Sequence, residues 1–264
     1  MDGTLLNSNH EVSEKNKAAL KECVEKGVHV AIATGRIYTS ARVYAKHLEI
    51  LTPIIACNGA MIRNMKTDEV LYESHIKKED CLKVVEIAKK NQIYFHYYSG
   101  DTFYTEELEY SSVFYSEWNK TLNEEDQIKI QLVEDAYAHI KNSKEPIYKI
   151  QMISEDPEML MKMRKEVEKI SSIECCKSWH NNIEIMNKGV SKASAIKELE
   201  KLLNVQQEEI ICFGDNENDI SMLNYAGMGV AMDNAEDIVK QNADYITATN
   251  NEDGVEKALR KFVL

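Results

Sequence analysis

The chain lacks an excess of basic side chains. It carries 32 lysines and arginines against 44 aspartates and glutamates, which gives a formal net charge of -12 at pH 7. Such a charge disfavours a nucleic-acid backbone or an anionic membrane as a partner. It does not disfavour a small anionic substrate, because a metal ion or a local basic cluster can reverse the field within one cleft. We therefore expect no nucleic acid and no membrane among the partners.

Long apolar runs, paired cysteines and linker-like segments are also missing. No apolar stretch reaches the roughly 18 residues that span a membrane, and the N-terminus has no signal-peptide pattern. The six cysteines form no C-x-x-C pair, which indicates buried, reduced thiols. Adjacent Cys175 and Cys176 would point to opposite faces of a strand, which argues against a shared metal. The three prolines leave no obvious flexible linker. We expect a soluble, cytoplasmic protein.

The first third of the chain alternates helical and strand-like patterns. Residues 13–26 have the periodicity of an amphipathic helix that stops at Gly27. "VHVAIATGR" then predicts an apolar strand over residues 28–33, and "PIIACNGA" predicts another. Fully apolar strands that alternate with helices indicate a parallel sheet covered on both faces. Function in such sheets collects at the carboxyl ends of the strands.

The pattern of apolar and polar residues changes between residues 80 and 184. Predicted helices at 79–90 and 157–170 alternate with tyrosine-rich segments, "IYFHYYS" and "IYKIQMIS", which look half-exposed. This pattern predicts an inserted α+β domain whose sheet is partly solvated on one face. From Ile185 the alternation of helices and apolar strands resumes, with a predicted helix at 191–203 and the apolar strand "IICFGD". The partition is therefore a core of residues 1–79 and 185–264, with an insertion at 80–184.

Four polar clusters follow predicted strands or open helices. They are Asp2-Gly3-Thr4, Thr34-Gly35-Arg36, Lys192 after "NKGVS", and "GDNEND" from Gly214 to Asp219. Each alone has a simple structural explanation as a turn, a solvated helix face or a helix N-cap. Their occurrence together, in this order and at the ends of parallel strands, is more specific than any one of them.

Together these clusters resemble the motifs of the haloacid dehalogenase (HAD) phosphatase superfamily. "ATGR", "CNGA", "NKGVSK" and "GDNENDISML" stand where its Cof-type small-molecule phosphatases have their signatures, and the resemblance runs along the whole chain. It implies an α/β fold with a Rossmann-like core built on a parallel sheet. It also implies an inserted α+β cap of the class IIB type between the second and third motifs, as residues 80–184 would be.

The resemblance also implies an acid/base and a metal site. Asp2 would be the general acid/base, and its backbone carbonyl would face a Mg²⁺ ion. Asp215 would bind the metal directly, and Asp219 would bind or orient it. Hard oxygen donors suit Mg²⁺, which keeps several waters and bridges to phosphate.

Phosphate binding would fall to residues at the other strand ends. The implied set is Thr34, Gly35, Arg36, Asn58, Lys192 and Asn218. Thr34 and Lys192 would hold the phosphoryl oxygens, the lysine also having a catalytic role as a point charge. Asn58 and Asn218 would donate from their amides, and Gly35 allows close backbone approach. Arg36 would meet the substrate or pair with the cap.

The beginning of the chain departs from the family motif. In D-x-D-G-T the first aspartate is the nucleophile, and Asp2 matches the second, so the nucleophile would lie one residue before Met1. Either an internal methionine has been taken as the start, or the protein is a chemically inactive descendant that binds phosphorylated ligands. The intact set of Asp2, Thr34, Lys192, Asp215 and Asp219 favours the first explanation. The 264-residue chain is expected to be inactive through N-terminal truncation.

The leading hypothesis is Mg²⁺-dependent hydrolysis of small phosphomonoesters through an aspartyl-phosphate. Candidate substrates are sugar phosphates or phosphorylated cofactors such as pyridoxal phosphate and flavin mononucleotide. The alternative is a non-catalytic protein that binds phosphorylated metabolites. A phosphomutase is a weaker third hypothesis, since the predicted cap has no arginine cluster for a second phosphate.

The cap sequence says little about specificity. Trp179 or His180, in "CCKSWHNN", could face the substrate, but a packed aromatic and an exposed histidine explain the segment equally well. The substrate and the oligomeric state stay open.

Overall fold

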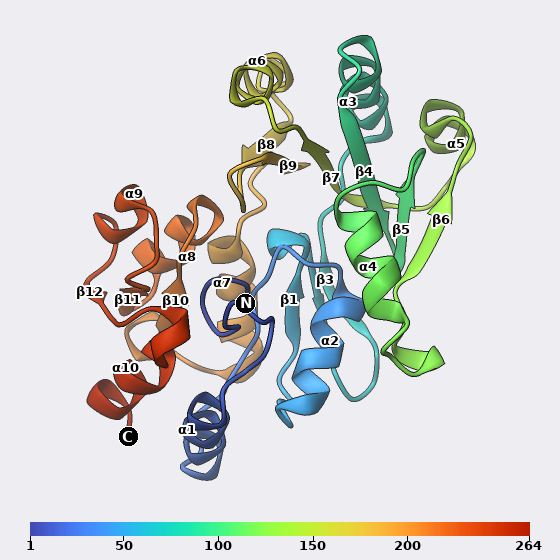
Figure 1. Cartoon of the computed structure of the whole chain (residues 1–264). Coiled ribbons are helices and arrows are strands. Elements are labelled where there is room, and N and C mark those ends of the chain that lie inside the picture. Colours follow the sequence, from blue (N-terminus) through green and yellow to red (C-terminus); the bar gives the residue numbers. More distant parts are fainter.

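Three β-sheets organise the chain, which the computed structural model describes from residue 1 to residue 264. Two sheets have three strands each, in the orders β1-β2-β3 and β10-β11-β12. The third has six strands in the order β6-β5-β4-β7-β9-β8. In Figure 1 the six-stranded sheet and its helices lie above the two smaller sheets, and the N-terminus lies between those two. The α/β fold class is confirmed.

The bounds of the elements are as follows. The strands are β1 (Ile54–Ala56), β2 (Met61–Arg63), β3 (Val70–Glu73), β4 (Tyr94–Ser99), β5 (Thr102–Thr105), β6 (Lys129–Leu132), β7 (Ile147–Ile153), β8 (Ile173–Cys176), β9 (Asn182–Asn187), β10 (Ile211–Gly214), β11 (Met228–Ala231) and β12 (Tyr245–Ile246). The helices are α1 (Glu14–Glu25), α2 (Tyr38–His47), α3 (Lys78–Lys90), α4 (Ser111–Asn119), α5 (Ala136–Asn142), α6 (Pro157–Val167), α7 (Lys192–Leu203), α8 (Ile220–Tyr225), α9 (Asp237–Lys240) and α10 (Gly254–Phe262).

Local sequence signals account for the helix ends. The side chain of Ser13 accepts a hydrogen bond from the Asn16 N–H at the start of α1, and Gly27 follows its end with a φ of +83°. Ser191 caps α7 in the same way, through the N–H of Ser194. These caps satisfy N–H groups that the first helical turn leaves free. The predicted helices at 13–26 and 191–203 are confirmed.

The core strands depart from the prediction of one continuous parallel sheet. β10, β11 and β12 are parallel, whereas β1, β2 and β3 are antiparallel. The predicted strand at 28–33 is wrong, since only Ala33 forms a bridge, to Ile55. On one edge of this segment, the carbonyl of Ile32 accepts a hydrogen bond from the Ile55 N–H at 2.9 Å. Apolar composition alone does not make a strand, because a strand also needs neighbouring strands for its backbone hydrogen bonds. The other edge of this segment has no such neighbour.

Helices connect the two small sheets. α7 and α8 pack between β1–β2 and β10–β11, in a cluster that includes Ile55, Ala195 and Leu223. On the other side, α1 and α10 cover a second cluster, against which Val30 and Phe213 are partly buried. The segment at 28–33 and strand β10 therefore pack under the same pair of helices.

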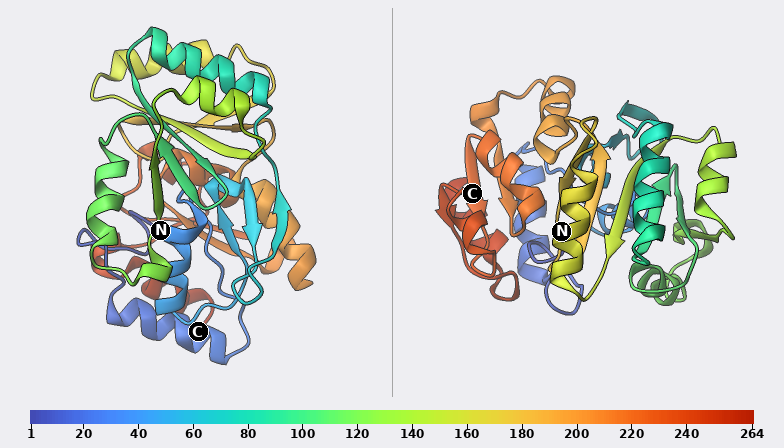
Figure 2. Two further views of the ribbon diagram at one scale, coloured as in Figure 1. Left: turned by 90° about the vertical axis from the view of Figure 1, so that its right-hand side faces the viewer. Right: turned by 90° about the horizontal axis from the view of Figure 1, so that it is seen from above.

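The six-stranded sheet is covered on both faces. Helices α3, α5 and α6 pack on one face in the largest apolar cluster, as Figures 1 and 2 show. The other face contributes Tyr98, Phe103 and Tyr148 to a cluster shared with residues of the core, among them Ile37 and Met61. All seven residues of β7 are buried. The predicted half-solvated sheet is therefore wrong, because this face packs on the core and on α4.

The cysteines are free thiols. Cys175 packs with the cluster under α3, α5 and α6, and Cys176 with the cluster on the opposite face, as predicted for neighbours on a strand. Burial raises the pKa of the Cys57, Cys81 and Cys212 thiols to about 12. The division at residues 80 and 184 stays a prediction. No helix combines the length and the apolar character that crossing a membrane requires.

Candidate active site

Most of the predicted site residues line one cavity of about 900 Å³. The residues that do so are Asp2, Thr34, Gly35, Arg36, Lys192, Asp215, Asn218 and Asp219. They come from the N-terminal turn, the end of the 28–33 segment, the start of α7 and the turn after β10. Asn58 lies outside this cavity. It lines a neighbouring one of about 430 Å³, which Lys192 and Asn218 also border.

Lys192 and Asp219 form a buried ion pair at the centre of the cluster. The Nζ of Lys192 lies 2.5 Å from Oδ1 of Asp219. The other carboxylate oxygen accepts the N–H groups of Asp215 and Asn216, at 2.9 and 3.1 Å. Burial disfavours the charged lysine, but Asp219 outweighs it and raises the pKa of Lys192. Asp219 thus holds both the ammonium group and the turn that carries Asp215.

Asp215 lies against the N-terminal turn. The hydroxyl of Thr4 donates to its Oδ1, at 2.5 Å. A Cβ at Gly3, where φ is +68°, would lie 2.2 Å from the other carboxylate oxygen, so only glycine admits this approach. Burial, assisted by the charge of Asp219, raises the pKa of Asp215 to about 6. A cation at this carboxylate would relieve that cost.

Arg36 holds the side chain of Asp2. Its Nε and one terminal nitrogen donate to the two carboxylate oxygens, at 2.8 and 2.6 Å. The guanidinium also lies 5.2 to 5.8 Å from the ring centres of Tyr44, Phe114 and Trp118. Burial opposes ionisation of Asp2, yet Arg36 holds the pKa of Asp2 well below its usual range. Arg36 therefore contacts both Asp2 and α4, which carries Phe114 and Trp118.

Asn58 takes part in a buried polar chain that sequence reasoning missed. Its amide donates to Glu184 Oε2 at 2.7 Å, and its oxygen accepts the Asn218 amide at 3.0 Å. Glu184 also pairs with Lys149, whose Nζ donates to the Gly35 carbonyl at 2.5 Å. Lys149 and Glu184 are each 2% exposed. The signal that could have found them is a single charge within each of two apolar strands, "IYKIQMI" and "NIEIMN".

The six-stranded sheet, its loops and α4 supply a further part of the cavity wall, and loops of the core supply the remainder. Both Trp179 and His180, the predicted specificity candidates, line the cavity, as do Tyr110 and Phe114. Gln151 lines it as well and is another residue that the sequence did not single out. Aromatic side chains therefore form part of a cavity wall that is otherwise mostly polar.

The carboxylates partly suit a divalent cation. The side chains of Asp2, Asp215 and Asp219 do not gather as a ready-made metal cluster. Asp2 is engaged by Arg36 and Asp219 by Lys192, which leaves Asp215 as the carboxylate with an oxygen free of a cationic partner. Its raised pKa and its oxygen chemistry fit Mg²⁺. The assignment of all three residues as ligands stays a prediction.

Comparison with known proteins agrees with this geometry. The family model of haloacid dehalogenase-like hydrolases matches residues 1–259. The chain is 32% identical to the 5-amino-6-(5-phospho-D-ribitylamino)uracil phosphatase YcsE of Bacillus subtilis, over 100% of this chain and 94% of that protein. It is 29% identical to the pyridoxal phosphate phosphatase YbhA of Escherichia coli, over 97% and 93%.

A solved structure has the same fold. A HAD subclass IIB sugar phosphatase superposes with a TM-score of 0.82 at 27% identity, covering 99% of this chain and 96% of that one. The motifs, the cavity and these similarities lead to one conclusion. The chain belongs to the haloacid dehalogenase-like hydrolases and is a phosphatase of that family.

Proposed function

We propose that the site hydrolyses small phosphomonoesters with Mg²⁺, through the aspartyl-phosphate chemistry of the family. The observation that carries the proposal is the position of Lys192 and Thr34 beside Asp215 in one cavity. The named relatives support the substrate class, since they are phosphatases of a ribitylaminouracil phosphate and of pyridoxal phosphate.

Lys192 and Thr34 supply donors for the phosphoryl group. The ammonium has three N–H donors, of which Asp219 occupies one. The Thr34 hydroxyl accepts from the Arg36 N–H, at 3.1 Å, so its own proton is free to be donated. Lys192 also begins α7, where the positive end of the helix dipole favours an anion. Two side chains and one helix end can thus share the charge of a phosphate.

Asp215 is the residue best suited to hold Mg²⁺, with Asp219 fixing its backbone and the Asp2 carbonyl as a further ligand. When bound, the ion would stabilise negative charge on the phosphoryl oxygens. Asp219 would keep both Lys192 and the Asp215 turn in position, through the bonds already described.

Asp2 is the proposed acid/base. While Arg36 donates to both of its oxygens, Asp2 stays ionised and can accept a proton from water. Protonation of a leaving alcohol requires Asp2 to gain a proton first, and that requires Arg36 to withdraw at least one hydrogen bond. A bound phosphate is a competing partner for this guanidinium.

The nucleophile of the family motif corresponds to the position before Met1. The nearby carboxylates do not replace it, because Arg36 holds Asp2, Thr4 holds Asp215 and Lys192 holds Asp219. We therefore propose that turnover requires an aspartate joined directly to Met1. A protein that only binds phosphorylated metabolites would need none.

Binding of inorganic phosphate to the 264-residue chain tests the phosphate site directly. Lys192→Ala should weaken phosphate binding, measured by isothermal titration calorimetry, by about tenfold or more, which is roughly 1.4 kcal/mol. Lys201→Ala is the matched control, since Lys201 lies on the same helix and is 64% exposed. Equal phosphate affinity in the two variants would contradict the role of Lys192.

A further inference from the structure

Lys149 and Glu184 are buried charges that the proposed reaction does not use. Lys149 lies on β7 and Glu184 on β9, and both line the large cavity although each is only 2% exposed. The ammonium group of Lys149 donates to Glu184 and to the Gly35 carbonyl. It also lies 4.8 Å from the centre of the Tyr98 ring. Because these partners surround it, Lys149 is not a free cation for a substrate, and it acts on the site through the groups that it holds.

The first of these groups is the loop that carries Thr34. The carbonyls of Thr34 and Arg36 accept hydrogen bonds from backbone N–H groups of the turn after β1, at 2.9 and 3.0 Å. The Gly35 carbonyl between them accepts instead from Lys149 Nζ of the six-stranded sheet, at 2.5 Å. A Cβ at Gly35 would lie 3.2 Å from an oxygen of Glu184, which is a crowded contact. The lack of a side chain at this position therefore lets the ion pair reach the loop.

Glu184 extends the contact to the turn after β10. Its other oxygen accepts the Asn58 amide at 2.7 Å, and the Asn58 oxygen accepts the Asn218 amide at 3.0 Å. Asn218 directly precedes Asp219, whose carboxylate holds Lys192. The two side chains proposed to bind phosphate therefore lie at opposite ends of one chain of hydrogen bonds, which runs through Gly35, Lys149, Glu184, Asn58 and Asn218.

The hydrogen bonds of this chain have a fixed direction. An ammonium group only donates and a carboxylate only accepts, so the amide of Asn58 must place its nitrogen toward Glu184 and its oxygen toward Asn218. Glu184→Gln would offer one acceptor and one donor where both neighbours are donors. One of the two contacts would then set a donor against a donor. The chain therefore depends on the carboxylate and not only on the volume of the side chain.

We propose that Lys149 and Glu184 are positioning residues, which set the spacing between the two phosphate-binding side chains and thereby the affinity of the site for phosphate. The six-stranded sheet then contributes to phosphate binding without touching the phosphate. This inference rests on the proposed function, since it requires that Thr34 and Lys192 bind the phosphoryl group. It also gives a reason for two charges within apolar strands, where well-packed apolar residues are often as stable as a buried ion pair.

Phosphate binding in a variant that keeps its stability tests the inference. Lys149→Met combined with Glu184→Leu replaces both charges by apolar side chains of similar size, so much of the stability lost with one charge is recovered. We expect this double variant of the 264-residue chain to bind inorganic phosphate about tenfold more weakly, by isothermal titration calorimetry, because a displaced donor loses a hydrogen bond to a charged group. Urea denaturation measures its stability. A pair with a merely structural role would recover phosphate affinity together with stability.

An exchange of acid and amide tests the hydrogen-bond chain itself. Glu184→Gln alone should weaken phosphate binding about tenfold. Adding Asn58→Asp restores a donor for every acceptor along the chain and should recover most of the affinity. Aspartate, like asparagine, tolerates the φ of +58° at this position. Glu106→Gln is the matched control, because Glu106 pairs with Lys89 outside both cavities, and it should leave phosphate affinity unchanged.

Unchanged phosphate affinity in Glu184→Gln would overturn the inference, as would full recovery of affinity in the apolar double variant. An exchange variant that binds no better than Glu184→Gln would also contradict it. If the 264-residue chain itself binds no phosphate, the proposed phosphate site is wrong, and amide hydrogen exchange decides the positioning role. Exchange at residues 34–36 and 215–219 should be faster in Glu184→Gln than in the control, and equal rates would refute that role.

Discussion

At the scale of single residues, the carboxylates of the site differ by what surrounds them. Arg36 keeps Asp2 ionised, whereas burial and Asp219 leave Asp215 with a pKa of about 6. Two chemically identical groups within one cavity therefore respond to pH in different ranges. This difference gives a direct test of which carboxylate binds the metal.

Mg²⁺ affinity should depend on pH through Asp215. The proton and the cation compete for its carboxylate, so apparent affinity should be constant above pH 7 and fall about tenfold per pH unit below about 6. Titration calorimetry at several pH values measures this. Asp215→Asn should abolish both the binding and its pH dependence, and Asp233→Asn, at a position 59% exposed, should change neither. Binding that persists in Asp215→Asn would remove this residue from the metal site.

The Lys149–Glu184 pair should have a large effect on stability. Each group is 2% exposed, so removing Lys149 leaves the buried Glu184 carboxylate without a cationic partner. Lys149→Met should lower the free energy of unfolding by about 3–5 kcal/mol, measured by urea denaturation, and the double variant with Glu184→Leu should recover much of it. The exposed pair Lys188–Glu174 is the control, where Lys188→Ala should cost less than about 1 kcal/mol. A small effect of Lys149→Met would contradict the stabilising role of this pair.

At the scale of elements, sequence predicts what is decided locally. The caps at Ser13 and Ser191 and the apolar run of β10 predict α1, α7 and that strand within a residue or two. The segment at 28–33 has the same apolar character but forms no strand, because strand pairing depends on neighbours distant in sequence. The Asp2–Arg36 and Glu184–Asn58 contacts join positions 34 and 126 residues apart. Motif resemblance brought Asp2, Arg36 and Asn58 to notice, but it could not pair them.

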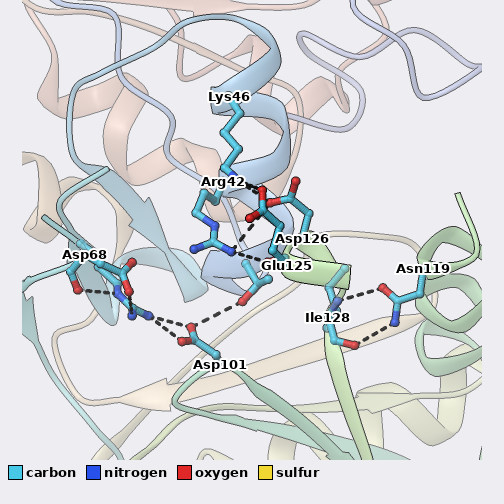
Figure 3. A network of polar contacts seen from close by, with 10 residues as sticks. Arg42, Lys46, Asp68, Asp101, Asn119, Glu125, Asp126 and Ile128 are labelled. Atoms are coloured by element: carbon cyan, nitrogen blue, oxygen red, sulfur yellow. Dashed lines mark hydrogen bonds and ion pairs between the residues drawn. The ribbon is translucent and has the colours of Figure 1, made fainter. Parts of the chain in front are cut away.

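Oppositely charged elements meet where α2 and β2 face the loops of the six-stranded sheet. Figure 3 shows Arg42 and Lys46 of α2 directed at Glu125 and Asp126. In the same network, Asp101 accepts hydrogen bonds from the Arg63 guanidinium. Lys46 Nζ lies 2.5 Å from Asp126 Oδ1, and Arg63 donates to Asp101 at 2.7 Å. Because these bonds join core elements to loops of the six-stranded sheet, they hold the two layers together.

Charge reversal tests this contact between elements. Asp126→Lys should lower the free energy of unfolding by about 1 kcal/mol, since the pair is partly screened, and adding Lys46→Glu should restore part of the loss. The same cycle at Lys120–Glu117, where both side chains are more than 60% exposed, should give a smaller coupling. Urea denaturation at low and high salt measures both cycles. Equal coupling energies, or coupling at Asp126 that salt does not reduce, would show that the contact is not electrostatic.

At the scale of the whole molecule, the 28–33 segment and β10 each leave one strand edge without a partner. The 28–33 segment pairs with β1 on one side only, and β10 pairs with β11 only. Val30 and Phe213 pack against the same apolar cluster under α1 and α10, so both unpaired edges are covered by the same two helices. One apolar strand paired with both edges would join the two sheets into one.

An apolar strand of about five residues ending in aspartate, joined directly to Met1, should therefore have two effects. It should raise the free energy of unfolding, because it supplies partners to both edges, and it should give Mg²⁺-dependent hydrolysis of p-nitrophenyl phosphate, because it places a nucleophile beside Lys192. The same extension ending in asparagine should raise stability equally and give no turnover. The 264-residue chain itself should hydrolyse essentially none. If instead this chain turns over substrate and Asp2→Asn abolishes the activity, then the reaction uses another nucleophile and the proposed mechanism is wrong.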